Sequence, residues 1–78
     1  MFAKSKLKKE IESCKEKIEF LEHKRNRSQA ALLDAIINHK DPDDEDVDYF
    51  NQFTEQIDTE RARLHALMDQ FKAATSRA

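Results

Sequence analysis

The chain has 78 residues, with no Gly, one Pro and one Cys, and its formal net charge at pH 7 is −2. This length allows one small domain, and the near absence of Gly and Pro excludes a fold rich in tight turns and strands. Ala, Glu, Lys, Leu and Arg make up about half of the residues, as in long helices and coiled coils. The single cysteine excludes an intrachain disulfide, and the small net charge selects no class of partner.

The first predicted element is a long helix over residues 5–38. Its apolar positions recur at alternating four- and three-residue steps, which is the period of a coiled-coil seam, the line of a and d positions that packs on a partner helix. The predicted seam consists of Leu7, Ile11, Cys14, Ile18, Leu21, Arg25, Ser28, Leu32 and Ala35. Cys14 lies on this seam, so we interpret it as a small buried side chain rather than a redox group or a ligand.

The second element is a turn at residues 39–43. Asn38 tolerates the left-handed conformation that ends helices, and a residue before proline is disfavoured in a helix, so the first helix is expected to end before Asp41. Asp41 can cap the next helix, with Pro42 at its first position, and Asp43 or Asp44 are alternative caps.

The third element is a helix over residues 44–75, whose acidic start suits the helix dipole. Its seam reads Phe50, Phe53, Ile57, Glu60, Leu64, Leu67, Phe71 and Ala74. The two seams can be aligned antiparallel so that a positions face d positions. In one such register the chain reverses its direction near Pro42. This register pairs Leu32 with Phe53, Leu21 with Leu64 and Cys14 with Phe71.

The same register places Arg25 opposite Glu60, the two charged seam residues. We predict a buried ion pair that fixes the register, since a slip would leave both charges unpaired. The alternative is that both side chains extend to water and never meet.

These elements predict an all-α, two-helix antiparallel hairpin that occupies residues 1–78 as a single domain. Residues 1–27 carry nine Lys or Arg against five Glu, whereas residues 41–60 carry nine Asp or Glu and no Lys or Arg. The hairpin therefore has a basic end and an acidic turn, and two hairpins placed head to tail would match opposite charges. We predict a homodimer that forms a four-helix bundle. The candidate contacts with this copy, or with another helical protein, are Phe20, Ile36, Ile37, Phe53 and Met68.

Catalytic, cofactor and metal sites are not predicted. Asp44, Asp46, Asp48 and Glu55 match acidic positions of a calcium-binding EF-hand loop, but Tyr49 replaces its essential Gly and the helical seam runs through the segment. Weak association of cations with the acidic turn remains the alternative.

The three histidines, His23, His39 and His65, lack metal-ligand spacing, and the sequence has no glycine-rich phosphate loop. We therefore expect no enzyme, no small-molecule substrate and no cofactor.

The four lysines between Lys4 and Lys9 are few for a nucleic-acid or membrane site, and Glu10 and Glu12 follow at once. No segment has a run of apolar residues long enough for a membrane span or a signal peptide, so the expected location is cytoplasmic.

A charged helical hairpin with an acidic, proline-containing turn is similar in architecture to small bacterial helical-hairpin proteins, including secretion-apparatus co-chaperones. The function that we expect is a structural or adaptor module that self-associates. The alternatives are a small chaperone-like partner of another helix and a binder of nucleic acid or membrane through the basic end.

Overall fold

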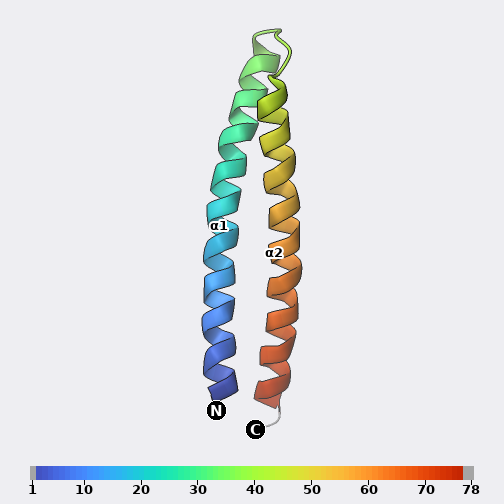
Figure 1. Ribbon diagram of the computed structural model, residues 1–78. Coiled ribbons are helices and arrows are strands. Elements are labelled where there is room, and N and C mark those ends of the chain that lie inside the picture. Colours follow the sequence, from blue (N-terminus) through green and yellow to red (C-terminus); the bar gives the residue numbers. More distant parts are fainter. Residues whose placement is uncertain (1, 77–78) are drawn as a thin grey trace.

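The computed structural model describes residues 2–76 and is a hairpin of two long helices (Figure 1). Helix α1 spans Phe2–Ile37 and helix α2 spans Asp44–Ser76, and the two pack along each other as an antiparallel pair. The Cα atoms fill an envelope of 59 × 16 × 14 Å, so the molecule is a rod. The predicted helical hairpin is confirmed. Residues 1, 77 and 78 of the predicted single domain lie outside the described part.

The buried positions follow the predicted seams. Every seam residue of both helices is buried or half-buried, whereas most residues between them are exposed. The most buried side chains lie near the middle of the rod, and Ile57 is fully inaccessible. They are Cys14, Ile18, Leu21, Ile57, Glu60 and Leu67. The 3.5-residue period of the sequence therefore identified the packed face of each helix.

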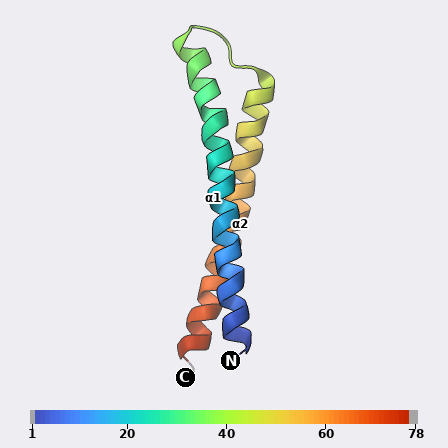
Figure 2. The same cartoon turned by 90° about the vertical axis from the view of Figure 1, so that its left-hand side faces the viewer.

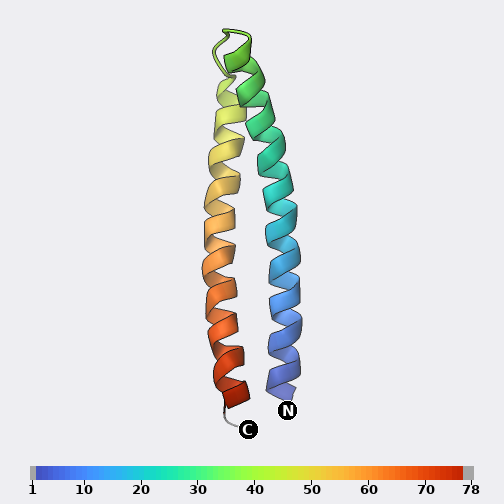
Figure 3. The same ribbon diagram turned by 180° about the vertical axis from the view of Figure 1, so that it is seen from behind.

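The register between the helices differs from the predicted one. The Cys14 thiol donates a hydrogen bond to the Glu60 backbone oxygen at 3.3 Å, whereas the predicted register puts Phe71 opposite Cys14. The contacts fit an alignment shifted by about one heptad, in which Ile18 instead of Arg25 lies level with Glu60. In agreement, the start of α1 and the end of α2 lie side by side at one end of the rod (Figures 1 and 3). The shift keeps a positions opposite d positions, so the seam pattern is satisfied by both registers.

The end of α1 is a Schellman cap, a hydrogen-bonded motif that ends many helices. Lys40 N–H donates to the Ala35 carbonyl at 2.8 Å and His39 N–H donates to the Ile36 carbonyl at 3.1 Å. His39 has the left-handed conformation, with φ of 57°, where the sequence favoured Asn38. The Asn38 side chain instead donates to the Asp34 carbonyl at 2.8 Å. Helix α1 thus ends through the backbone conformation of His39 and the side chain of Asn38.

The start of α2 lies beyond the proline. Helix α2 begins at Asp44. Its first backbone hydrogen bond runs from Val47 N–H to the Asp43 carbonyl, at 3.2 Å. Asp43 therefore occupies the N-cap position, for which Asp41 was the first prediction and Asp43 an alternative. The first turn contains Asp44, Glu45 and Asp46, whose negative charges interact favourably with the positive end of the helix dipole.

The middle of the rod packs more tightly than its ends. Viewed from the side, the helices cross near mid-length and diverge toward both ends (Figure 2). In the turn half, the seam residues Leu32, Phe50 and Phe53 are only half-buried. The turn half therefore has apolar surface that the hairpin itself does not cover.

Candidate interaction surface

Exposed apolar side chains gather around the turn. Seven large apolar side chains in the described part are exposed, and five of them lie between residues 33 and 49. We define the turn patch as four of these five: Leu33, Ile36, Ile37 and Val47. Ile36 is 59% exposed and Ile37 is 71% exposed, although isoleucine is among the residues most often buried in proteins.

The turn patch lies on one side of the hairpin. In heptad terms Ile36 and Val47 occupy e positions, and the e positions of two antiparallel helices border the same side of their seam. Leu33 and Ile37 continue the stripe around α1 on that side, because residues three and four apart are neighbours on a helix. The fifth exposed residue, Tyr49, lies on the other side and stacks on Phe53, with ring centroids 6.2 Å apart.

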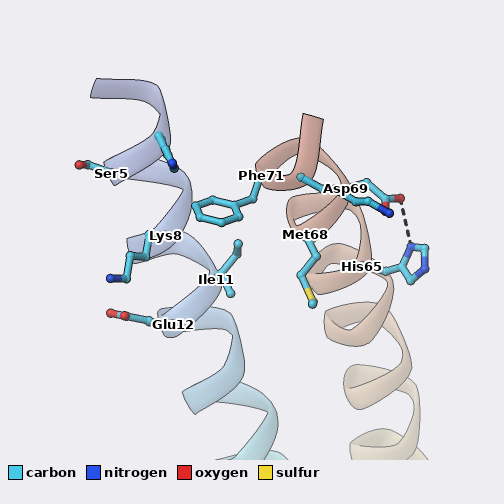
Figure 4. A pocket seen from close by; sticks show the side chains of 10 residues that line it. Ser5, Lys8, Ile11, Glu12, His65, Met68, Asp69 and Phe71 are labelled. Carbon is cyan, nitrogen blue, oxygen red and sulfur yellow. Dashed lines mark ion pairs between the residues drawn. The ribbon is translucent and has the colours of Figure 1, made fainter. Parts of the chain in front are cut away.

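A groove lies between the helices at the opposite end of the rod. Ile11, Met68 and Phe71 face one another between α1 and α2, with Ser5, Lys8 and Glu12 along one rim (Figure 4). We name this site the terminal groove; its lining residues are Lys4, Ser5, Lys8, Ile11, Glu12, His65, Met68, Asp69, Phe71 and Lys72. Met68 is 55% exposed, so apolar surface at the groove remains uncovered.

Lysines border the terminal groove. Lys4 Nζ lies 5.8 Å from the centre of the Phe71 ring, which is within the range of a cation–π contact. Across the groove His65 Nδ1 lies 3.4 Å from Asp69 Oδ2, on the exposed surface of α2. The groove thus combines an apolar floor with a rim of long, charged side chains that can move with a partner.

The predicted pair of Arg25 and Glu60 does not form. No ion pair in residues 2–76 joins these two side chains, because the heptad shift moves Arg25 away from Glu60. The Glu60 carboxylate instead lies 3.0 Å from Lys17 Nζ and 4.0 Å from Arg63 Nη1. The side chain of Lys17 is 58% exposed while that of Glu60 is 11% exposed, so the lysine reaches inward from the surface.

Glu60 and Cys14 form a small polar cluster inside the seam. The Lys17 hydrogen bond is the largest influence on Glu60 and lowers the pKa of its carboxyl group. Burial raises the pKa of the Cys14 thiol, and its hydrogen bond to the Glu60 carboxylate raises that pKa further. A buried thiol with a raised pKa is a poor nucleophile. The cluster is therefore part of the packed seam.

Phe20 and Phe53 differ in their surroundings. Phe20 is 59% exposed, and Lys24 Nζ lies 5.1 Å from the centre of its ring. Phe53 is half-buried in the seam and carries the stacking contact with Tyr49. Of the predicted interface residues, Ile36 and Ile37 therefore belong to the turn patch and Met68 to the terminal groove, whereas Phe20 stands apart.

The structure offers no metal site in its described part. No three His, Cys, Asp or Glu side chains among the described residues come together as possible ligands. Asp44 to Glu55, the segment that resembles an EF-hand loop, lies within the continuous helix α2. A helix cannot wrap its side chains around one calcium ion as the EF-hand loop does.

Neither a protein-family model, nor a curated protein, nor a solved structure matches the chain. Between residues 2 and 76, neither helix has an apolar stretch of the length required to cross a bilayer. The exposed surfaces of the hairpin are therefore the basis for its proposed function.

Sequence reasoning missed three features of these surfaces. Leu33 and Val47 were not among the contact residues predicted from the sequence. Sequence reasoning did not connect Lys17 with Glu60, because that contact depends on the register. It also did not find the terminal groove. The recurrence of apolar residues at e positions, at Ile36, Val47 and Met68, was the signal available in the sequence.

Proposed function

We propose that this protein is a non-enzymatic structural or adaptor module that self-associates through apolar helix faces. The observation that carries the proposal is the exposure of Leu33, Ile36, Ile37 and Val47 in one patch. A contiguous exposed apolar patch on a small protein marks a site where another molecule binds. Full burial of a fully exposed apolar side chain gains about 1.5–3 kcal/mol, so these four, which are 37–71% exposed, would each gain about half of that when covered.

The small size of the core supports the same proposal. Only five apolar side chains in the described part are buried, and each helix contributes one stripe. Chains of this length gain stability by association when their own core is thin. A second hairpin would supply two more helices and produce a four-helix bundle.

The charge distribution favours a head-to-tail dimer. Asp and Glu are concentrated at residues 41–60, whereas lysines gather near the N-terminus. Antiparallel rods bring the acidic turn of one copy near the basic end of the other. A two-fold axis across the rod makes both contacts identical, as in most homodimers.

Light scattering over a dilution series, at low and high salt, tests this proposal. We expect a mass of twice 9.2 kDa at micromolar concentrations and a weaker dimer at high salt. A chain that stays a folded monomer at every concentration would contradict self-association.

A reducing compartment such as the cytoplasm suits this module, because its cysteine is unpaired.

A second candidate function is that of a chaperone-like partner for another protein's helix. The observation that favours it is the loose seam of the turn half, where Phe50 and Phe53 are only half-buried. Such a seam can open to accept an amphipathic helix in place of a second hairpin. A folded monomer by light scattering would advance this candidate over the homodimer.

A further inference from the structure

We infer that the turn patch and the terminal groove are the two halves of one self-complementary interface, so that the groove receives the turn patch of a second copy. This inference rests on the self-association proposed above and adds the residues that meet. The two copies are antiparallel and contact each other through one face of each hairpin. The other side of the hairpin, which carries Tyr49, is left outside the contact.

The patch and the groove lie on the same face. Met68 follows Val47 by three heptads in α2, and Ile36 follows Lys8 by four heptads in α1. Residues separated by whole heptads keep the same position relative to the seam of a coiled coil. All four occupy e positions, so one face of the rod carries the turn patch at one end and the terminal groove at the other.

A two-fold axis across the rod brings these ends together. The axis sets α2 antiparallel on α2 of the second copy, and α1 on α1. Ile57, which is fully buried, lies about midway between Val47 and Met68 in α2. An axis near Ile57 therefore places Val47 of one copy on Met68 of the other. The same operation places Leu33 over Lys8 at the mouth of the groove.

Charge complementarity selects a second copy as the occupant. The groove is lined by Lys4, Lys8 and Lys72 and by two acids, Glu12 and Asp69, so its lysines outnumber its carboxylates by one. The aliphatic stems of the lysines can cover the incoming patch while their ammonium groups remain in water. The turn that accompanies the patch is acidic and brings Asp41, Asp43, Asp44, Glu45, Asp46 and Asp48. Two turn patches docked on each other would instead oppose these like charges.

The available area is sufficient for a stable dimer. A face of 59 × 16 Å offers about 900 Å², compared with about 800 Å² per partner in a standard interface. The middle of this face carries the ion pair between Arg61 and Glu22, whose closest atoms are 3.4 Å apart. The interface thus has a charged centre and two apolar ends.

Cross-linking between two single-cysteine additions tests this docking. A Val47→Cys chain and a tagged Met68→Cys chain are mixed, allowed to exchange, and treated with a short bismaleimide. We expect a cross-linked heterodimer in the mixture. We expect no cross-linked dimer when either chain is treated alone. Cys14 can stay in place, because it is 2% exposed and does not reach the reagent.

A matched control replaces Met68→Cys by Gln70→Cys, an exposed position at the same level of α2 but on the other side of the seam. We expect this pair to give no cross-linked heterodimer. If Val47→Cys alone cross-links, the copies meet turn to turn and the inference is overturned.

Light scattering on the same samples separates the two proposals. A stable dimer without the Val47–Met68 cross-link would retain self-association and reject this interface. A monomer would reject both. A monomer that gains mass only with a foreign amphipathic helix would assign the groove to another protein.

Discussion

The middle of the rod and the turn half share one seam pattern but differ in how well that seam is packed. In the middle, Ile18, Leu21 and Ile57 are almost completely buried. In the turn half, Arg25 and Ser28 occupy the α1 seam in the part that faces the aromatic rings of α2. A charged and a small polar side chain cannot fill the space between those rings as aliphatic side chains do.

Periodicity alone therefore does not close a helical interface. The middle and the turn half both have seam residues at the correct spacing, yet only the middle excludes water. The apolar side chains left exposed are concentrated in the half whose seam is weaker. We therefore associate stability with the middle of the rod and interaction with the turn half.

The largest effect is expected from Ile57→Ala. Ile57 is fully buried, and truncation of such a residue costs about 2–5 kcal/mol because it leaves a cavity. Chemical denaturation measures this loss of unfolding free energy. Phe20→Ala is the comparison: the ring is 59% exposed, so its loss should change stability by at most about 0.5 kcal/mol. Equal losses at both sites would refute the division between core and surface.

Repair of the turn-half seam should erase much of the difference between the halves. The double variant Arg25→Leu and Ser28→Leu replaces both polar seam residues by apolar ones. We expect about 2 kcal/mol of added stability, since each leucine gains part of the usual burial energy against Phe50 and Phe53. Denaturant titration measures the gain. A loss of stability would mean that Arg25 has a stabilising contact in the turn half.

The register can be tested through Glu60. A double-mutant cycle with Lys17→Met and Glu60→Gln should give a coupling of about 1 kcal/mol, reduced because Lys17 is largely exposed. The same cycle with Arg25→Met should give a coupling near zero. The reverse result would support the register predicted from the sequence.

The same coupling should depend on pH in a defined direction. Lys17 lowers the pKa of Glu60 in the folded protein, so the contribution is present at neutral pH, above the pKa of the unfolded chain. It is lost as the pH falls through the lowered pKa and the carboxylate is protonated. Unfolding measured between neutral and acidic pH should show the Lys17→Met variant and the parent converge at low pH.

The smallest effect is expected at the turn. His39 has a φ of 57°, a region that costs residues with a Cβ atom some energy and that glycine adopts freely. His39→Gly should stabilise the hairpin by about 0.5 kcal/mol, after part of the gain is offset by the larger entropy of the unfolded chain. Asn38→Gly, one residue earlier, is the control and should destabilise, since the Asn38 side chain bonds to Asp34.

The amino-acid sequence was enough to predict the two helices, the break between them and the face that each helix buries. These features depend on local causes: a 3.5-residue period, a proline and a run of acids at a helix start. It also determined the opposite charges of the two ends, because they follow from the order of residues along the chain. The exposed positions of Ile36, Ile37 and Met68 followed from the same period.

The register between the helices, and with it the partner of Glu60, could be seen only in the folded hairpin. A shift of one heptad returns every a and d residue to an equivalent position, so the seam pattern has the same form in both registers. The choice depends on how the turn closes and on which side chains meet across the seam. Arg25 and Glu60 were matched by an alignment that the pattern allowed, whereas Lys17 reaches Glu60 in the alignment that forms. The groove and the turn patch depend on that register as well, because both are shaped by which residues of the two helices lie level.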